Sequence, residues 1–271
     1  MFVNNPYYVY INSRDRQNGT DENFSYAINF PPDLEFTHVV CLNALIPKSY
    51  YLIQEGGLEN VFQLKENNTT VTITVPIGSY LLSAFKNKIG ALLTANSPNG
   101  LTYILTFPPD TGPQTGKWTY TQSNAAITSS LIFNSHLFEP FGFFSNSTNV
   151  FTGITLVSTC CAKLQSEDRL LIHSNIAENP GNDDILASIN STSNINFSSI
   201  AYECPAPEFY SHKLSSKLNT YDFSLTDENN ELIPLNGLNV NITLLFYKRD
   251  DIFDKIKDSL RLVILKSEQK K

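Results

Sequence analysis

Alternation of apolar and polar residues with a period of two runs through most of the chain and predicts β-strands. In residues 24–30 every second side chain is aromatic or aliphatic, as in a strand with one buried face. Residues 37–47 are almost continuously apolar, which is typical of a strand covered on both faces. Near the C-terminal end, residues 240, 242, 244 and 246 are apolar and alternate with polar neighbours. We expect this last strand to lie centrally and to pair back to an early strand.

A helical period appears in two places only. Residues 78–100 carry one apolar face and end in the turn formers "SPNG", and Ser79 is the expected N-cap. This helix sits within residues 51–149, which read as a ββαβββ unit that interrupts the other strands. Residues 249–271 are also expected to be helical, with an apolar stripe formed by Ile252, Phe253, Ile256, Leu260 and Val263.

These patterns predict a mainly β protein, a single jelly-roll sandwich with an inserted small α+β subdomain. An antiparallel protein must protect its edge strands, and a jelly roll does so by wrapping its strands into two packed sheets. We expect the jelly roll in residues 21–50 and 150–248, and the inserted subdomain in residues 51–149. Residues 1–20, which are mostly polar after Tyr10, are expected to form an N-terminal arm, and residues 249–271 a C-terminal helical tail.

The composition narrows the class of function. Among 271 residues, 41% are hydrophobic, 12% are aromatic and only 17% are charged, below the ~25% of an average soluble domain. This balance suits β structure and a protein that hides much of its surface in an assembly. The net charge of −7 argues against a general nucleic-acid binder, although Arg14, Arg16 and the terminal lysines form small basic patches. The sequence contains no run of about 18 apolar residues, so we expect no membrane span. We also recognise no secretory signal in the first residues.

Motifs for catalysis or cofactor binding are missing from the sequence. There is no phosphate-binding GxxxxGK[ST] loop, no dinucleotide-binding GxGxxG after a strand, no GxSxG and no HExxH. The four histidines are scattered, and His173 lies inside a strand pattern, where a hydrogen-bonded, half-buried imidazole is expected. The four cysteines form no CxxC pair. We therefore expect no enzyme, no catalytic residue, no cofactor and no metal site.

Several motifs occur in one order along the chain: "YINSRDR", "NFSYAINFP" and "VVCLNALIPKSYY", then "PIGSY" and "LFEPFGF", and finally "LNTYDFSLTDENNELIPLNGLNVNITLLFYK". Together they resemble the minor capsid (penton) proteins of virophages and of the related polinton-like double-stranded DNA viruses, over about residues 8–248. The resemblance implies a jelly-roll penton subunit in the virion, assembled in the host cytoplasm. Five copies would occupy each fivefold vertex of an icosahedral capsid, beside trimers of a double-jelly-roll major capsid protein. No catalytic residues are implied.

The terminal segments carry the candidate contact residues. Arms of jelly-roll shells tie subunits together, so inter-subunit or interior-facing contacts are expected at Tyr7, Tyr8, Arg14, Arg16, Ile252, Phe253, Ile256 and Leu260. Through the same arms, the basic residues are candidates for contact with packaged DNA. Two alternatives stay open, a receptor-binding or spike protein and a cement-type minor capsid protein on the same β scaffold. A jelly-roll enzyme such as a cupin is a third, and would require a His/Glu metal cluster across strands.

Overall fold

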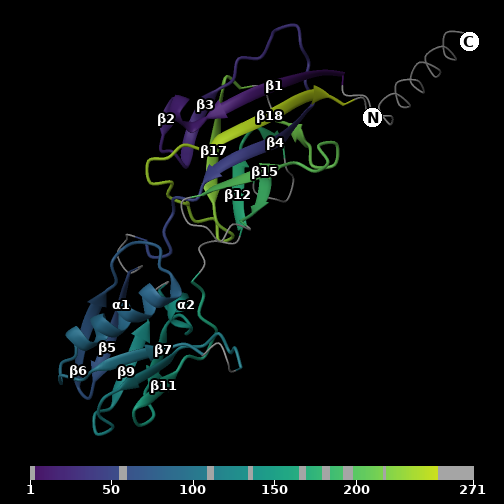
Figure 1. The fold of residues 1–271 in the computed structure, drawn as a ribbon. Coiled ribbons are helices and arrows are strands. Elements are labelled where there is room, and N and C mark those ends of the chain that lie inside the picture. Colours follow the sequence, from purple (N-terminus) through teal and green to yellow (C-terminus); the bar gives the residue numbers. More distant parts are fainter. Residues whose placement is uncertain are drawn as a thin grey trace, which may run out of the picture. The chain divides into compact units, whose positions relative to one another are not determined.

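A computed structural model describes residues 4–54, 60–108, 113–133, 137–164, 169–178, 184–191, 198–215 and 218–249. The chain divides into two compact units (Figure 1). Unit 1 combines Met1–Ser49 with Glu167–Lys271, and unit 2 is Tyr50–Ser166. Residues 150–166 therefore belong to unit 2 and not, as expected, to the same body as the last strands. The reason is strand pairing, because residues Thr155–Val157 of this segment pair with Thr119–Thr121 of unit 2.

Unit 1 contains a six-stranded antiparallel sheet with the chain's last described strand near its centre. Strand β18 (Asn241–Lys248) pairs on one side with β1 (Asn4–Asn12) and on the other with β4 (His38–Pro47). Beyond β4 the sheet continues with β16 (His212–Leu214) and β13 (Ala177–Glu178), while β15 (Ser199–Glu203) pairs with the other end of β4. The central place of β18 and its pairing with an early strand agree with the expectation from its alternating pattern.

A second, five-stranded antiparallel sheet completes unit 1. Its order is β14 (Ile185–Asn190), β12 (Arg169–Ser174), β17 (Thr220–Thr226), β3 (Asn23–Ala27) and β2 (Asn18–Gly19). Aromatic side chains join the two sheets. The fully buried Phe246 of β18 lies 5.0 Å from the ring of Phe30 and 5.9 Å from that of Phe36, and Phe30 also contacts Tyr221 of β17. The core of unit 1 thus lies between its sheets.

The start of the chain is a strand and not an arm, which corrects the expectation for residues 1–20. Residues of β1 pair with β18 from Tyr7↔Phe246 to Asn12↔Asn241, and Ile11 is 2% exposed. The short 3-10 helix η1 (Ser13–Asp15) and strand β2 follow directly. The physical reason is that β18 needs a backbone partner on its second edge, and the alternating segment "YYVYIN" supplies one. The polar residues after Tyr10 form a turn between strands.

Unit 2 has its own sheets, helices and core. One sheet has the order β10 (Ser147–Val150), β9 (Ser129–Phe133), β5 (Val61–Glu66) and β6 (Thr69–Thr74), and the other β11 (Thr155–Val157), β8 (Thr119–Gln122) and β7 (Tyr103–Thr106). Helix α2 spans Phe138–Phe141. The buried cluster is rich in aromatic rings, including Phe62, Phe85, Trp118, Tyr120, Phe133 and Phe141.

Helix α1 (Leu82–Ala95) forms where the apolar period predicted it and buries Phe85, Ile89 and Leu93. Its beginning differs from the expectation. The N-cap is Leu81, which makes no side-chain capping bond, whereas the Ser79 hydroxyl accepts a hydrogen bond from the Leu52 amide at 3.3 Å. Ser79 therefore binds the segment around Leu52, where unit 2 begins, and does not cap the helix. No helix in the described ranges is long and apolar enough to cross a membrane.

The contact between the sheets of unit 1 yields a stability prediction. Replacing Phe246 by Ala removes a fully buried ring that packs on two others, and we expect the free energy of unfolding to fall by about 3–5 kcal/mol. Urea unfolding followed by circular dichroism measures this change. Leu238→Ala is the control, because Leu238 is 50% exposed and its loss leaves no cavity. Equal changes in the two variants would contradict the assignment of Phe246 as the central core residue.

Candidate functional site

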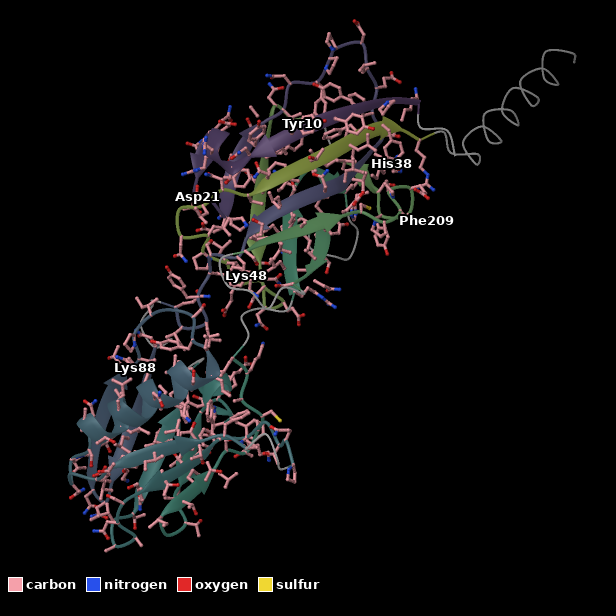
Figure 2. The ribbon with its side chains drawn as sticks, in the orientation of Figure 1. Tyr10, Asp21, His38, Lys48, Lys88 and Phe209 are labelled. Atoms are coloured by element: carbon pink, nitrogen blue, oxygen red, sulfur yellow. The ribbon has the colours of Figure 1, made fainter. Side chains whose placement is uncertain are left out.

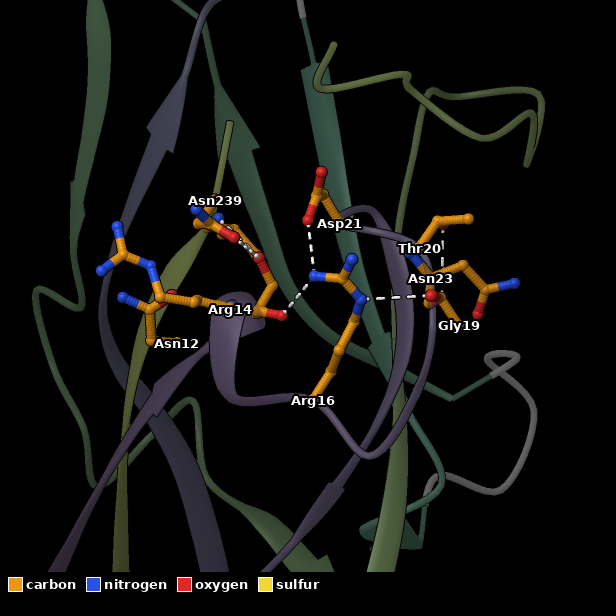
Figure 3. A network of polar contacts seen from close by, with 10 residues as sticks. Asn12, Arg14, Arg16, Gly19, Thr20, Asp21, Asn23 and Asn239 are labelled. Carbon is orange, nitrogen blue, oxygen red and sulfur yellow. Dashed lines mark hydrogen bonds and ion pairs between the residues drawn. The ribbon is translucent and has the colours of Figure 1, made fainter. Parts of the chain in front are cut away.

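The turn after β1 is organised around Arg16 (Figure 3). The Arg16 guanidinium donates through Nη1 to the Ser13 carbonyl at 2.9 Å and to the Asp21 carboxylate at 2.7 Å, and through Nε to the Gly19 carbonyl at 3.1 Å. A planar guanidinium with several fixed donors suits such a cluster of acceptors. Arg16 is thereby committed to holding the turn that leads from β1 into β2.

Hydrogen bonds also fasten this turn to the start of β18. Ser13 is fully buried, its amide donates to the Val240 carbonyl at 3.0 Å, and its hydroxyl accepts from the Val240 amide at 3.1 Å. The Asn12 side chain accepts from the Arg14 amide and donates to the Asn241 side chain, both at 2.9 Å. The first turn of the chain is thus joined to a strand more than 200 residues later.

The structure separates the two arginines that the sequence placed together. Arg14 is exposed, whereas Arg16 is partly buried and bound within the protein. The Arg16 guanidinium is thus used within the turn, and of the two arginines Arg14 is the more exposed. Residue spacing alone could not reveal this, because the acceptors are backbone carbonyls positioned by the turn.

The tyrosines of β1 are separated in the same way. Tyr7 is partly buried, stacks on Phe36 at 5.5 Å and donates its hydroxyl to the Asn29 carbonyl at 3.4 Å. Tyr7 therefore takes part in the packing of unit 1. Tyr8 and Tyr10 are 47% and 74% exposed, because successive side chains of a strand point to opposite faces. Tyr10 was not predicted as a contact residue, although the alternation in "YYVYIN" places it on the same face as Tyr8.

The remaining candidate contacts, Ile252, Phe253, Ile256 and Leu260, lie outside the described residues, as does the expected helical tail beyond Arg249. Two other exposed aromatic residues were missed in the sequence. Phe209 and Tyr210 lie in the connection between β15 and β16 and are 82% and 56% exposed. No period marks them, because they follow "CPAP" and belong to no strand.

One cluster has the order of groups found in hydrolase triads. His173 contacts the Asp184 carboxylate through Nδ1 at 3.0 Å and the Thr226 hydroxyl through Nε2 at 2.8 Å. Thr226 is however only 5% exposed, and its hydroxyl donates to the Asp227 carbonyl at 3.1 Å. A nucleophile must reach a substrate, and this hydroxyl is buried and already bound. The cluster fastens β12 to β17, which fits the hydrogen-bonded imidazole expected from the sequence.

A buried carboxylate in unit 2 is likewise used for structure. Glu66 at the end of β5 is fully buried and accepts hydrogen bonds from Ser97 Oγ, the Asn99 amide, Asn99 Nδ2 and the Tyr103 hydroxyl, at 2.7–3.0 Å. Four donors satisfy a buried carboxylate without a cation. They join β5 to the turn after α1 and to β7.

The thiol of Cys41 is buried and unsuited to nucleophilic chemistry. Burial, with a smaller effect of nearby Cys204, raises the pKa of the Cys41 thiol to about 12, so Cys41 stays protonated at neutral pH and is a poor nucleophile. Within the described ranges, no three His, Cys, Asp or Glu residues are grouped so that they could hold a metal ion.

Comparison with known proteins places the chain by its fold. No protein-family model matches the sequence, and no curated protein matches it. The fold is mainly β with several antiparallel sheets, consistent with the β-rich folds of capsid proteins. Among solved structures, it matches the crystal structure of the mavirus penton protein with a TM-score of 0.50 and 14% sequence identity. The match covers 90% of this chain and 100% of that chain, and at this identity it shows a shared fold.

The Arg16 network predicts unequal roles for two neighbouring arginines. Arg16→Ala removes three hydrogen bonds in the turn, and we expect a loss of about 1–3 kcal/mol in the free energy of unfolding. Arg14→Ala, the matched control, should change it by less than about 0.5 kcal/mol, because the Arg14 side chain is exposed. Urea unfolding of both variants measures the difference. An Arg14 effect as large as that of Arg16 would refute this assignment.

His212 on β16 predicts a pH dependence of stability. Burial lowers the pKa of its imidazole below the ordinary 6.5, against an opposing effect of the Leu186 carbonyl, which accepts from Nε2 at 3.2 Å. The unfolded chain therefore binds the proton more readily, so stability is retained above about pH 6.5 and decreases as the pH falls below it. Thermal unfolding between pH 7.5 and about 5 measures the slope.

His212→Gln serves as the control, because glutamine can donate to the same carbonyl and does not titrate. We expect the stability of the variant to decrease less steeply as the pH falls. The carboxylates contribute equally to the pH dependence of both proteins, so their contribution cancels in the comparison. Parallel curves for the two proteins, or a wild type that gains stability relative to the variant at low pH, would contradict the prediction.

Proposed function

We propose that this protein is a structural capsid protein that forms the pentameric vertex of an icosahedral virus particle. The observation that carries the proposal is the fold match to the mavirus penton protein, which extends over 90% of this chain and the whole of that one. A match of that extent includes both units and not merely a common β-sandwich. The ordered sequence motifs over residues 8–248 point to the same class of protein.

The interior chemistry supports a structural role. The polar groups that could resemble an active site, at His173 and Glu66, are buried and used to join strands. The features left at the surface of unit 1 are exposed aromatic residues, which are typical of protein contacts. In this proposal unit 1 is a single jelly roll, five copies surround the vertex, and trimers of the major capsid protein are their neighbours in the virion.

A receptor-binding role for unit 2 is the second candidate and is compatible with the first. Its support is that unit 2 has a hydrophobic cluster made entirely of its own residues, which suits a module that projects from a scaffold. A cement-type role, by contrast, would place the chain between capsomers and away from the fivefold axes.

Electron cryomicroscopy of particles of the virus that encodes this chain tests the proposal. We expect density for unit 1 in a ring around every fivefold axis. Particles in which residues 50–166 are replaced by a short linker are the comparison, and they should keep this ring and lose the density of unit 2. Absence of the chain from the particles, or its location away from the fivefold axes, would refute the proposal.

A further inference from the structure

One edge of the six-stranded sheet presents exposed tyrosines. Strand β1 is the last strand of the sheet order on this side, next to β18. Its outward side chains Tyr8 and Tyr10 are 47% and 74% exposed. Its inward residues are packed, as shown by Ile11 at 2% exposed, and β1 pairs with β18 along most of its length. The tyrosines therefore stand on a strand that is fixed in place.

The other side of the same sheet presents a second aromatic group. Phe209 and Tyr210, 82% and 56% exposed, lie in the connection from β15 to β16, beyond β4. The labelled Tyr10 lies along β1, while Phe209 lies on the far side of β18 and β4 (Figure 2). In each group two exposed aromatic side chains lie close together, and neighbouring exposed apolar side chains, unlike single ones, are a feature of contact surfaces.

Hydrogen bonds and a buried residue anchor the connection that carries Phe209. The amides of Phe209 and Tyr210 both donate to the Ala206 carbonyl, at 3.0 and 3.2 Å. Before it, Cys204 is 5% exposed, packs in a buried cluster with Val40 and Leu245, and donates its amide to the Leu42 carbonyl at 2.8 Å. A turn fixed at its base loses little entropy when its aromatic residues become buried in a contact.

Strand register places Tyr8 and the beginning of β16 at neighbouring levels along the strands. Tyr8 is opposite Leu245, and Leu245 is opposite Val40. On the other side of β4, His212 is opposite Val39, so the antiparallel chain reaches the level of Val40 one residue earlier, directly after Tyr210. Three strand spacings, or roughly 14 Å, separate β1 from β16 across the sheet.

A closed ring of identical subunits requires this kind of arrangement. Each subunit must carry two different patches, and the ring closes only if passing from one patch to the other involves rotation without a rise along the axis. Two unlike aromatic groups, one on β1 and one in the connection before β16, meet the first of these conditions.

We propose that Tyr8 and Tyr10 of one copy bind the turn carrying Phe209 and Tyr210 of the next copy, and that repetition of this contact closes the ring. The occupant of each patch is thus a second copy of this chain. Aromatic residues are enriched at the centres of such contacts. The inference rests on the proposed function for the number of subunits, five, and adds the residues and the head-to-tail polarity of the contact.

Two double variants of the full chain test the proposal. Tyr8→Thr with Tyr10→Thr alters the first patch, and Phe209→Ser with Tyr210→Ser alters the second. Threonine retains a preference for strands, and all four side chains are at least 47% exposed, so both variants should fold. Matching circular dichroism melting curves check this. Phe144→Ser, at a residue 60% exposed in unit 2, is the control outside the proposed contact.

Native mass spectrometry and sedimentation velocity give the readout. We expect pentamers for the wild type and for Phe144→Ser, and monomers for each double variant alone. An equimolar mixture of the two double variants should give one-to-one dimers and nothing larger. In that mixture each variant has one intact patch, so a single contact forms and no ring can close.

Three results would overturn the inference: a monomeric wild type, pentamers in either double variant, or a mixture that forms no dimer. If the double variants also still occupy the fivefold vertices of particles, the contact lies elsewhere and the proposed function stands. If a monomeric wild type occupies those vertices, the aromatic groups face other capsid proteins. If the chain is absent from the vertices, the proposed function itself fails.

Discussion

Strand β18 is the element on which unit 1 depends, because both edges of its backbone and the ring of Phe246 are used at once. It pairs with β1 and β4, which lie near the beginning of the chain, and Phe246 joins its sheet to the opposite one through Phe30 and Phe36. Neither early strand can complete its sheet until almost the entire chain is present. Such contacts between distant segments are costly in chain entropy, and the turn at Ser13 and Asn12 adds hydrogen bonds to the same junction.

The polar groups of this protein that resemble catalytic residues stabilise its fold. Arg16, Glu66 and His173 would each attract attention as isolated residues. Each is bound by acceptors or donors that belong to another element, and together they fasten a turn, a helix exit and a strand pair. With these groups committed inside, the outward tyrosines of β1 and the turn at Phe209 are the features that remain for contacts with a partner.

The placing of unit 2 between two parts of unit 1 suits a scaffold that carries a separate module. The aromatic cluster around Trp118 and Phe141 involves residues of unit 2 alone. Strands of unit 1 before and after the insertion are held by pairing with each other, so the insertion need not contribute to their stability. Such a division suits the second candidate function, in which unit 1 assembles and unit 2 binds a receptor.

The sequence by itself determined most of the local elements: the alternating strands observed as β3 (Asn23–Ala27) and β18 (Asn241–Lys248), the helix with Phe85, Ile89 and Leu93 on one face, and the interruption of one β unit by another. These follow from periodicity, which depends only on neighbouring residues. Tertiary structure alone decided that residues 4–12 are a strand and that residues 150–166 belong to unit 2. It also decided that Arg16 and Tyr7 are partly buried and bonded within the protein, while Tyr10 and Phe209 are exposed. The physical reason is that backbone pairing and side-chain burial depend on segments far away in the chain, which no local pattern encodes.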